Sequence, residues 1–157
     1  MQPYIIQTIM GIFGSVGFAV LFGIYDWKLA VIAPCSGVGW IVYLVCVAAG
    51  YGVFTGLFVA SLFVAAVSEI LARILKTPVI LWLVPMLIPE IPGGDLYDTM
   101  YYLVQGRYTE FGISSNQVLV EAGAIALGII LASYIVKITE SIVRWQEKQR
   151  KRRQIKD

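Results

Sequence analysis

The sequence has no histidine and only two cysteines among its 157 residues. Without histidine the chain lacks the commonest metal ligand and the side chain that usually transfers protons near neutral pH, so proton transfer must fall to carboxylates. Cys35 and Cys46 are too far apart along one predicted helix to form a disulfide, and both are interpreted as small apolar packing residues. We predict no metal and no cofactor. The G-x-x-x-x-G-K phosphate-binding loop is also missing, which excludes ATP as the energy source within this chain.

Charged residues are scarce as well. They make up 14% of the chain, and hydrophobic residues make up 59%, whereas about a quarter of the residues in a soluble domain are charged. The sequence therefore predicts an all-α integral membrane protein, with a transmembrane domain over residues 1–143 and a basic cytoplasmic tail over residues 144–157. Because a bilayer core about 30 Å thick needs about 20 helical residues, we predict five transmembrane helices, the last of which continues as an amphipathic helical arm into the tail. They cover residues 4–24, 29–49, 53–75, 78–106 and 117–136.

The basic residues predict the orientation. With five spans, Lys28, Arg73, Lys76, Lys137 and the seven basic residues of the tail lie on one side, and Arg107 alone lies on the other. Since Lys and Arg concentrate in cytoplasmic loops, we expect the N-terminus outside and the C-terminus in the cytoplasm. A second copy of a unit with an odd number of spans would be inverted relative to the first, and inverted repeats build many secondary transporters. We therefore expect the chain to need a partner.

The fourth predicted span is interrupted. Its sequence, TPVILWLVPMLIPEIPGGDLYDTMYYLVQG, combines apolar residues with prolines, a Gly-Gly pair and three carboxylates. Irregular backbone and ionisable groups persist at membrane depth only where protein or a water-filled cavity surrounds them, so this segment is typical of a transport site. We predict that the helix breaks at Pro92-Gly93-Gly94 and that a half-helix starts at Asp95, whose side chain caps it.

This geometry suits a small zwitterion or anion. The half-helix amides would hold a carboxylate, while Glu90 or Asp98 would meet an ammonium group or a proton. In the alternative interpretation, Pro92 to Asp95 form an outer loop with solvated acids, but the apolar run before Pro92 is only about 15 residues, short for a span. For Glu121 two readings stay open: it joins a proton path with Glu90, or it lies near the outer headgroups.

Two further patterns concern packing. Glu69 and Arg73 are four residues apart, which predicts an ion pair on one helix face rather than a functional site. Small residues recur every four positions in three spans, which lets helices approach closely within the chain or between chains. They are Gly11, Ser15, Ala19 and Gly23; Gly52, Gly56 and Ala60; and Ala124, Gly128 and Ala132.

The segments LARILKTP, LVPMLIPEIPGGDLYDTM and LVQGRY, with FAVLFG and SGVGW nearer the start, carry a family resemblance. From about Val16 to Ser133 the chain resembles the small YjjB-like membrane subunit of the threonine/serine exporter (ThrE-like) family. The resemblance implies export of threonine and serine, or of a dicarboxylate such as succinate, from a bacterial plasma membrane together with a YjjP-like partner subunit. Glu90 and Asp95 depart from the family pattern, and their added negative charge favours an amino acid or a coupling cation over a dicarboxylate.

Together these observations predict one subunit of a secondary transporter, not an enzyme, that exports small polar metabolites and is coupled to protons. The alternatives are a succinate-exporter subunit and a non-transporting scaffold subunit. Membrane lipids and a second subunit, in a hetero- or homo-oligomer, are the expected partners, and nucleic acid is not. The predicted substrate and ion pathway comprises Pro85, Pro89, Glu90, Pro92, Gly93, Gly94, Asp95, Tyr97, Asp98, Thr99 and Glu121.

Overall fold

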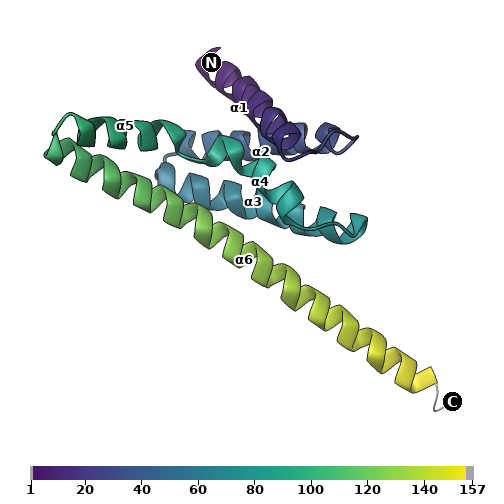
Figure 1. Ribbon diagram of the computed structural model, residues 1–157. Coiled ribbons are helices and arrows are strands. Elements are labelled where there is room, and N and C mark those ends of the chain that lie inside the picture. The colour runs from purple at the N-terminus through teal and green to yellow at the C-terminus, as the bar shows by residue number, and fades with distance from the viewer. Residues whose placement is uncertain (1, 155–157) are drawn as a thin grey trace.

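The computed structural model describes the backbone of residues 2–154 and the side chains of residues 4–142 and 145. Every element in this part of the chain is helical (Figure 1). The basic side chains of the predicted tail lie outside the described residues. The elements are α1 (Gln2–Leu21), α2 (Leu29–Ala48), α3 (Gly52–Leu75), α4 (Ile80–Leu87), the 3-10 helix η1 (Ile88–Glu90), α5 (Gly93–Val104) and α6 (Tyr108–Gln154).

Four of these helices are long and apolar enough to cross a membrane: α1, α2, α3 and the first 35 residues of α6. The predicted first three spans agree with α1 to α3 within three residues at each end. The predicted fifth span, residues 117–136, lies inside α6, which starts nine residues earlier and runs on as one helix of 47 residues. At 1.5 Å per residue α6 is about 70 Å long, and its C-terminal end projects past the other helices (Figure 1).

The predicted fourth span consists of three short helices rather than one broken helix. Ile91 is extended (ψ 125°) and Pro92 is non-helical (ψ 63°), so the interruption lies at these two residues. Gly93 and Gly94 belong to the first turn of α5, and the N-cap residue of this helix is Pro92. The observed interruption therefore includes Pro92 of the predicted Pro92-Gly93-Gly94 break but not the two glycines, and α5 starts two residues before Asp95, which is not the cap residue. Two prolines that lack N–H groups, Pro89 and Pro92, suffice to end the helix before the glycines are reached.

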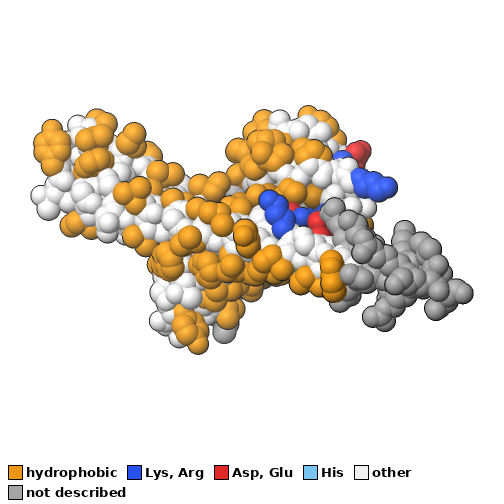
Figure 2. Space-filling model, turned by 90° about the horizontal axis from the view of Figure 1, so that it is seen from below, with side chains coloured by type: hydrophobic (Ala, Val, Ile, Leu, Met, Phe, Trp, Pro, Cys, Tyr) orange, Lys and Arg blue, Asp and Glu red, His pale blue; other side chains and the backbone are white. Residues whose placement is uncertain are grey.

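Helix α3 lies at the centre and contacts α2, α4 and α6. The apolar core between α2, α3 and α4 contains Ile32, Val64, Trp82 and Met86, all with 0–1% of their surface exposed. The indole N–H of Trp82 donates to Thr77 Oγ1 at 2.8 Å, so this large ring is buried without an unpaired donor. Hydrophobic side chains are spread over the whole described face in Figure 2, and the few charged side chains visible there lie from its middle toward the right.

A polar cluster joins α3 to α6. The predicted Glu69–Arg73 ion pair is confirmed. The same two residues also reach across to α6, where Ser133 Oγ donates to Glu69 Oε1 at 2.7 Å and Arg73 pairs with Glu140. Glu69 is therefore buried with its charge compensated, as a structural role requires.

Some of the small residues mark contacts within the chain, whereas a Cβ atom on Gly23 or Gly52 would meet nothing within 4 Å. Gly128 of α6 lies against the backbone of α3, where a Cβ atom would come within 2.7 Å of Phe58 O and 3.0 Å of Leu62 N. Gly56 of α3 packs on Tyr43 of α2 in the same way, with a Cβ 2.9 Å from the ring. Of the two alternatives that the spacing left open, close packing inside this chain accounts for these positions.

Candidate functional site

The 3-10 helix η1 places Glu90 in the middle of the fold. Its carboxylate lies against Gly39 of α2 and Val64 of α3, and a Cβ atom on Gly39 would be 2.7 Å from Glu90 Oε1. Gly39 is the eleventh of the 20 residues of α2, and Val64 the thirteenth of the 24 residues of α3. Glu90 therefore lies at the level of the midpoints of two helices of membrane-spanning length.

The neighbouring Pro89 is seated on α1 by a second close approach. A Cβ atom on Gly11 would come within 3.1 Å of Pro89 Cβ. Glycines on two helices thus form the seat of η1, with Gly11 beneath the proline and Gly39 beneath the carboxylate. Close helix packing in lipid depends on such small residues.

The side chain of Glu90 is 2% exposed, and neither of its oxygens has a hydrogen-bond partner among the described residues. A cavity of about 90 Å³ adjoins it, and no basic residue lines this cavity. We name it the carboxylate cavity. Its lining residues are Trp40, Tyr43, Val53, Leu57, Pro89, Glu90, Ile91, Pro92, Asp95 and Glu121.

Glu121 of α6 lines the same cavity. It is 3% exposed; Gln117 Nε2 donates to its Oε1 at 3.1 Å, and its Oε2 receives no donor from the described residues but lies within reach of the Asp95 carboxylate. Trp40 Nε1 is buried without an acceptor among the described residues. The residues that line this small cavity therefore include one indole donor without an acceptor and three carboxylate oxygens without a donor. Because each unsatisfied buried polar group costs about 1–3 kcal/mol, this arrangement indicates that protons, water or a ligand complete it.

A second hollow, which we name the acidic cleft, lies between α5 and the start of α6. It has a volume of about 270 Å³. Asp95 lines both the acidic cleft and the carboxylate cavity, so it stands at the junction of the two. The cleft is lined by Asp95, Asp98, Tyr102, Glu110, Ile113, Ser114 and Gln117.

Hydrogen bonds between α5 and α6 fix the position of Asp95. The Thr99 hydroxyl bonds to the Asp95 carbonyl oxygen at 2.6 Å and lies 2.5 Å from Ser114 Oγ of α6. Ser114 Oγ also approaches the Asp95 carbonyl at 3.4 Å. The backbone of Asp95 is thereby tied to both helices, and its carboxylate is left to face the two hollows.

The structure brings five of the residues predicted for the pathway together at the carboxylate cavity: Pro89, Glu90, Pro92, Asp95 and Glu121. The other six lie elsewhere. Asp98 lines the acidic cleft, Thr99 ties α5 to α6, Pro85 is buried within α4, Tyr97 is 70% exposed and stacks on Tyr101, and Gly93 and Gly94 begin α5.

Sequence reasoning missed the part of the cavity wall that α2 contributes. Trp40 and Tyr43, whose rings are 4.8 Å apart, sit one turn from each other, and Gln117 supports Glu121 from the preceding turn of α6. The available signal was the run Gly39-Trp40, in which a small residue precedes a polar-tipped ring in the middle of an apolar span.

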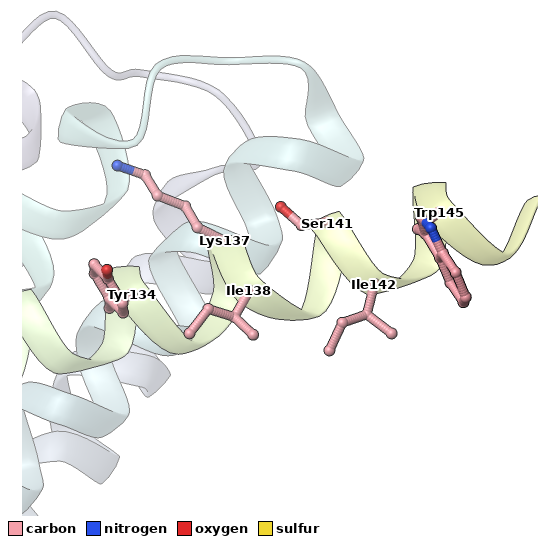
Figure 3. Close-up of a pocket in the computed structure, with 6 residues that line it drawn as sticks. All are labelled: Tyr134, Lys137, Ile138, Ser141, Ile142 and Trp145. Carbon is pink, nitrogen blue, oxygen red and sulfur yellow. The ribbon is translucent and has the colours of Figure 1, made fainter. Parts of the chain in front are cut away.

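A larger hollow, of about 700 Å³, is remote from these carboxylates. It lies along the far part of α6, and its lining residues, Tyr134, Lys137, Ile138, Ser141, Ile142 and Trp145, all belong to that one helix (Figure 3). One helix cannot enclose a ligand, so this hollow is an open face of the helical arm and not an active site. Nor is any group of three or more Cys, Asp or Glu suited to hold a metal found in the searched part of the chain.

The close contact between Gly39 and the Glu90 carboxylate leads to a testable prediction. Gly39→Ala places a methyl group 2.7 Å from both Glu90 Oε1 and Val64 Cγ2. Because both atoms belong to side chains that can shift, we expect a cost of only about 1 kcal/mol in unfolding free energy, together with displacement of the carboxylate. Thermal unfolding in detergent would measure the first effect. Gly17→Ala is the control, because a Cβ atom there meets nothing within 4 Å; equal stability of the two variants would contradict the packing described here.

Comparison with known proteins gives one match. Residues 7–135 fit the family model described as threonine/serine exporter, ThrE. No curated protein and no solved structure matches the chain.

Proposed function

Because this chain belongs to the threonine/serine exporter family, we propose that it is one subunit of a proton-coupled secondary exporter of threonine and serine. The family is a family of transporters, and the chain is a multi-pass membrane protein. The proposal extends these facts to the substrate, the coupling ion, the partner and the residues that act. The observation that carries it is the buried, unpartnered Glu90 carboxylate beside a cavity.

The surroundings of Glu90 support coupling to protons. A carboxylate with no counter-charge at the level of the helix midpoints is costly when ionised, and such groups in membrane proteins serve ion or proton paths. Glu121 and Trp40 line the same space. A mixture of donor and acceptor groups suits protonated carboxyls and water, whereas a bare metal cation would be repelled by the indole N–H.

The size of the carboxylate cavity supports a partner. Substrate pockets usually measure about 300–1,000 Å³, and about 90 Å³ holds only a few water molecules. The cavity serves the coupling proton, and a second membrane subunit, of the YjjP-like kind that the resemblance implies, completes the substrate site. The pathway role of the eleven predicted residues belongs to this proposal, with Glu90, Glu121 and Asp95 as its centre.

The chemistry of the lining favours an amino acid over a dicarboxylate. Neither the carboxylate cavity nor the acidic cleft has a basic side chain in its wall. Two carboxylates on a substrate would be repelled, whereas the ammonium group of threonine would be attracted. In a scaffold subunit without a transport role, buried unpaired acids would lower stability without serving a function.

We propose that the helices insert with the N-terminus outside and the C-terminus in the cytoplasm of a bacterium. In this arrangement α4, η1 and α5 make up one crossing. Residues 80–104 provide about 35 Å of helix at 1.5 Å per residue, enough for a hydrocarbon core of about 30 Å.

Vesicles loaded with radiolabelled threonine or succinate test this function. We expect threonine efflux from vesicles that contain this chain with its partner, little efflux with either chain alone, and loss of efflux when the proton gradient is collapsed. Succinate should remain in the vesicles. Equal efflux with and without this chain would contradict the proposal. Efflux of succinate but not of threonine would show that succinate, not threonine, is the substrate.

A further inference from the structure

Carboxylates connect the interior of the fold to one end of the molecule. Glu90 and Glu121 line the carboxylate cavity, Asp95 lines both hollows, and Asp98 and Glu110 line the acidic cleft. The two innermost acids are 98% and 97% buried and keep unpaired oxygens at the cavity. Acids that merely solvate a surface would not continue inward to such positions.

The direction of this series follows from the helices that line it. The cavity wall starts at Glu90, beside the midpoints of α2 and α3, and ends at Tyr43 and Val53, near the adjoining ends of these helices. Beyond those ends α5 and the first turns of α6 extend side by side as a hairpin (Figure 1). The acidic cleft lies in that hairpin, so the hollows follow one another from the middle of the fold toward one end.

The electrostatic environment along the series is negative. Tyr43 of α2, Asp95 of α5 and Glu121 of α6 face the carboxylate cavity around Glu90, and none of them is basic. At the mouth of the cleft Arg107 is paired with Glu110 at 2.7 Å and lies over the ring of Tyr102. The guanidinium is thus held at the rim, and the two aspartates face the cleft without it.

We propose that the acidic cleft and the carboxylate cavity form one cation-selective access path, with Asp95 at the junction, through which protons reach Glu121 and then Glu90 from the side of the α5–α6 hairpin. The role of this path in proton coupling rests on the proposed function. The geometry of the path is independent of that function. Clefts that are lined by charges of one sign raise the local concentration of counter-ions and reject ions of that sign.

Charge-selective labelling tests the path. Glu121→Cys, in a background with Cys35→Ala and Cys46→Ala, is reacted in lipid nanodiscs with 2-aminoethyl or 2-sulfonatoethyl methanethiosulfonate. The thiolate attacks the reagent sulfur, a disulfide forms and methanesulfinate leaves. We expect the cationic reagent to react at least about tenfold faster than the anionic one. Because both reagents meet the same thiol, the ratio of their rates does not depend on its ionisation.

Two comparisons make the test specific. Tyr51→Cys, exposed in the connection between α2 and α3 and outside both hollows, gives the ratio outside the path. Adding Asp95→Asn and Asp98→Asn to Glu121→Cys should bring the ratio close to that reference. An unchanged ratio after removal of both aspartates, or equal ratios at positions 121 and 51, would overturn the proposal.

A variant at a second position protects the test against misfolding. If Glu121→Cys does not fold, Gln117→Cys reports on the cleft from an exposed position, and the same ratio and the same loss with the aspartate variants are expected there. Labelling needs no transport. Selective labelling without threonine export would therefore support the access path and contradict the proposed function. Threonine export without selective labelling would support the proposed function and contradict the access path.

Discussion

Glu90→Gln should abolish proton-coupled threonine export while leaving the fold intact. Glutamine keeps the size of the side chain, and among the described residues neither oxygen of Glu90 has a partner, so no ion pair there is lost. What disappears is the ability to bind and release a proton. Since a positioned proton-transfer group contributes about 100-fold or more to a rate, we expect export to fall by about that factor, measured as the initial rate of efflux from loaded vesicles.

Asp26→Asn is the matched control for this change. Asp26 is an exposed acid between α1 and α2, outside both hollows, and its amide variant should export normally. Thermal unfolding of the Glu90→Gln chain should occur within a few degrees of the unmodified chain. Export at the normal rate by a folded Glu90→Gln chain would remove this carboxylate from the coupling mechanism and would favour the scaffold alternative if Asp95→Asn were equally silent.

Among the glycine-to-alanine substitutions, Gly128→Ala should destabilise the fold most. The added Cβ atom would overlap Ser61 Oγ and lie 2.7 Å from Phe58 O and 3.0 Å from Leu62 N. Two of these three atoms belong to the backbone of α3 and cannot rotate away, so α3 and α6 must separate. We expect a loss of roughly 1–3 kcal/mol in unfolding free energy, measured by denaturant titration in mixed micelles.

Gly123→Ala gives the reference on the same helix. A Cβ atom at position 123 meets nothing within 4 Å, so the change removes only the helix-destabilising freedom of glycine and should be neutral or stabilising by up to about 1 kcal/mol. If both alanine variants unfolded alike, the tight contact between α3 and α6 would not be a determinant of stability.

The helices α1, α2 and α3 could be predicted because local sequence decides them. Each is an apolar run of 20–24 residues, and a helix of that length satisfies all its internal backbone groups in lipid. The Glu69–Arg73 pair was accessible for the same reason, since positions four apart on a helix always lie on one face. The three acids of the cavity could be selected by their chemistry, because an ionisable residue in an apolar span is seldom kept without a function.

What the sequence could not supply depends on contacts between distant segments. Gly39 and Trp40 matter because η1, some fifty residues later, is seated against them, and the local run Gly39-Trp40 does not identify η1 as the partner. The helical break was predicted at Pro92-Gly93-Gly94, and the structure interrupts the helix at Ile91 and Pro92 while the glycines are helical, because the missing N–H of proline suffices to end a helix. The polar start of α6 resembled a loop, but packing against α5 holds it in a helix.

The unbroken course of α6 has a mechanical consequence. Gly128, where α6 touches the backbone of α3, is the natural fulcrum of a rigid rod. Glu121 lies about 10 Å from this point, and the last described residue, Gln154, lies about 39 Å from it on the other side. A tilt that shifts Glu121 by 1 Å would swing the distant tip by about 4 Å in the opposite direction. A change in what occupies the carboxylate cavity would therefore produce a larger displacement at the C-terminal end of α6.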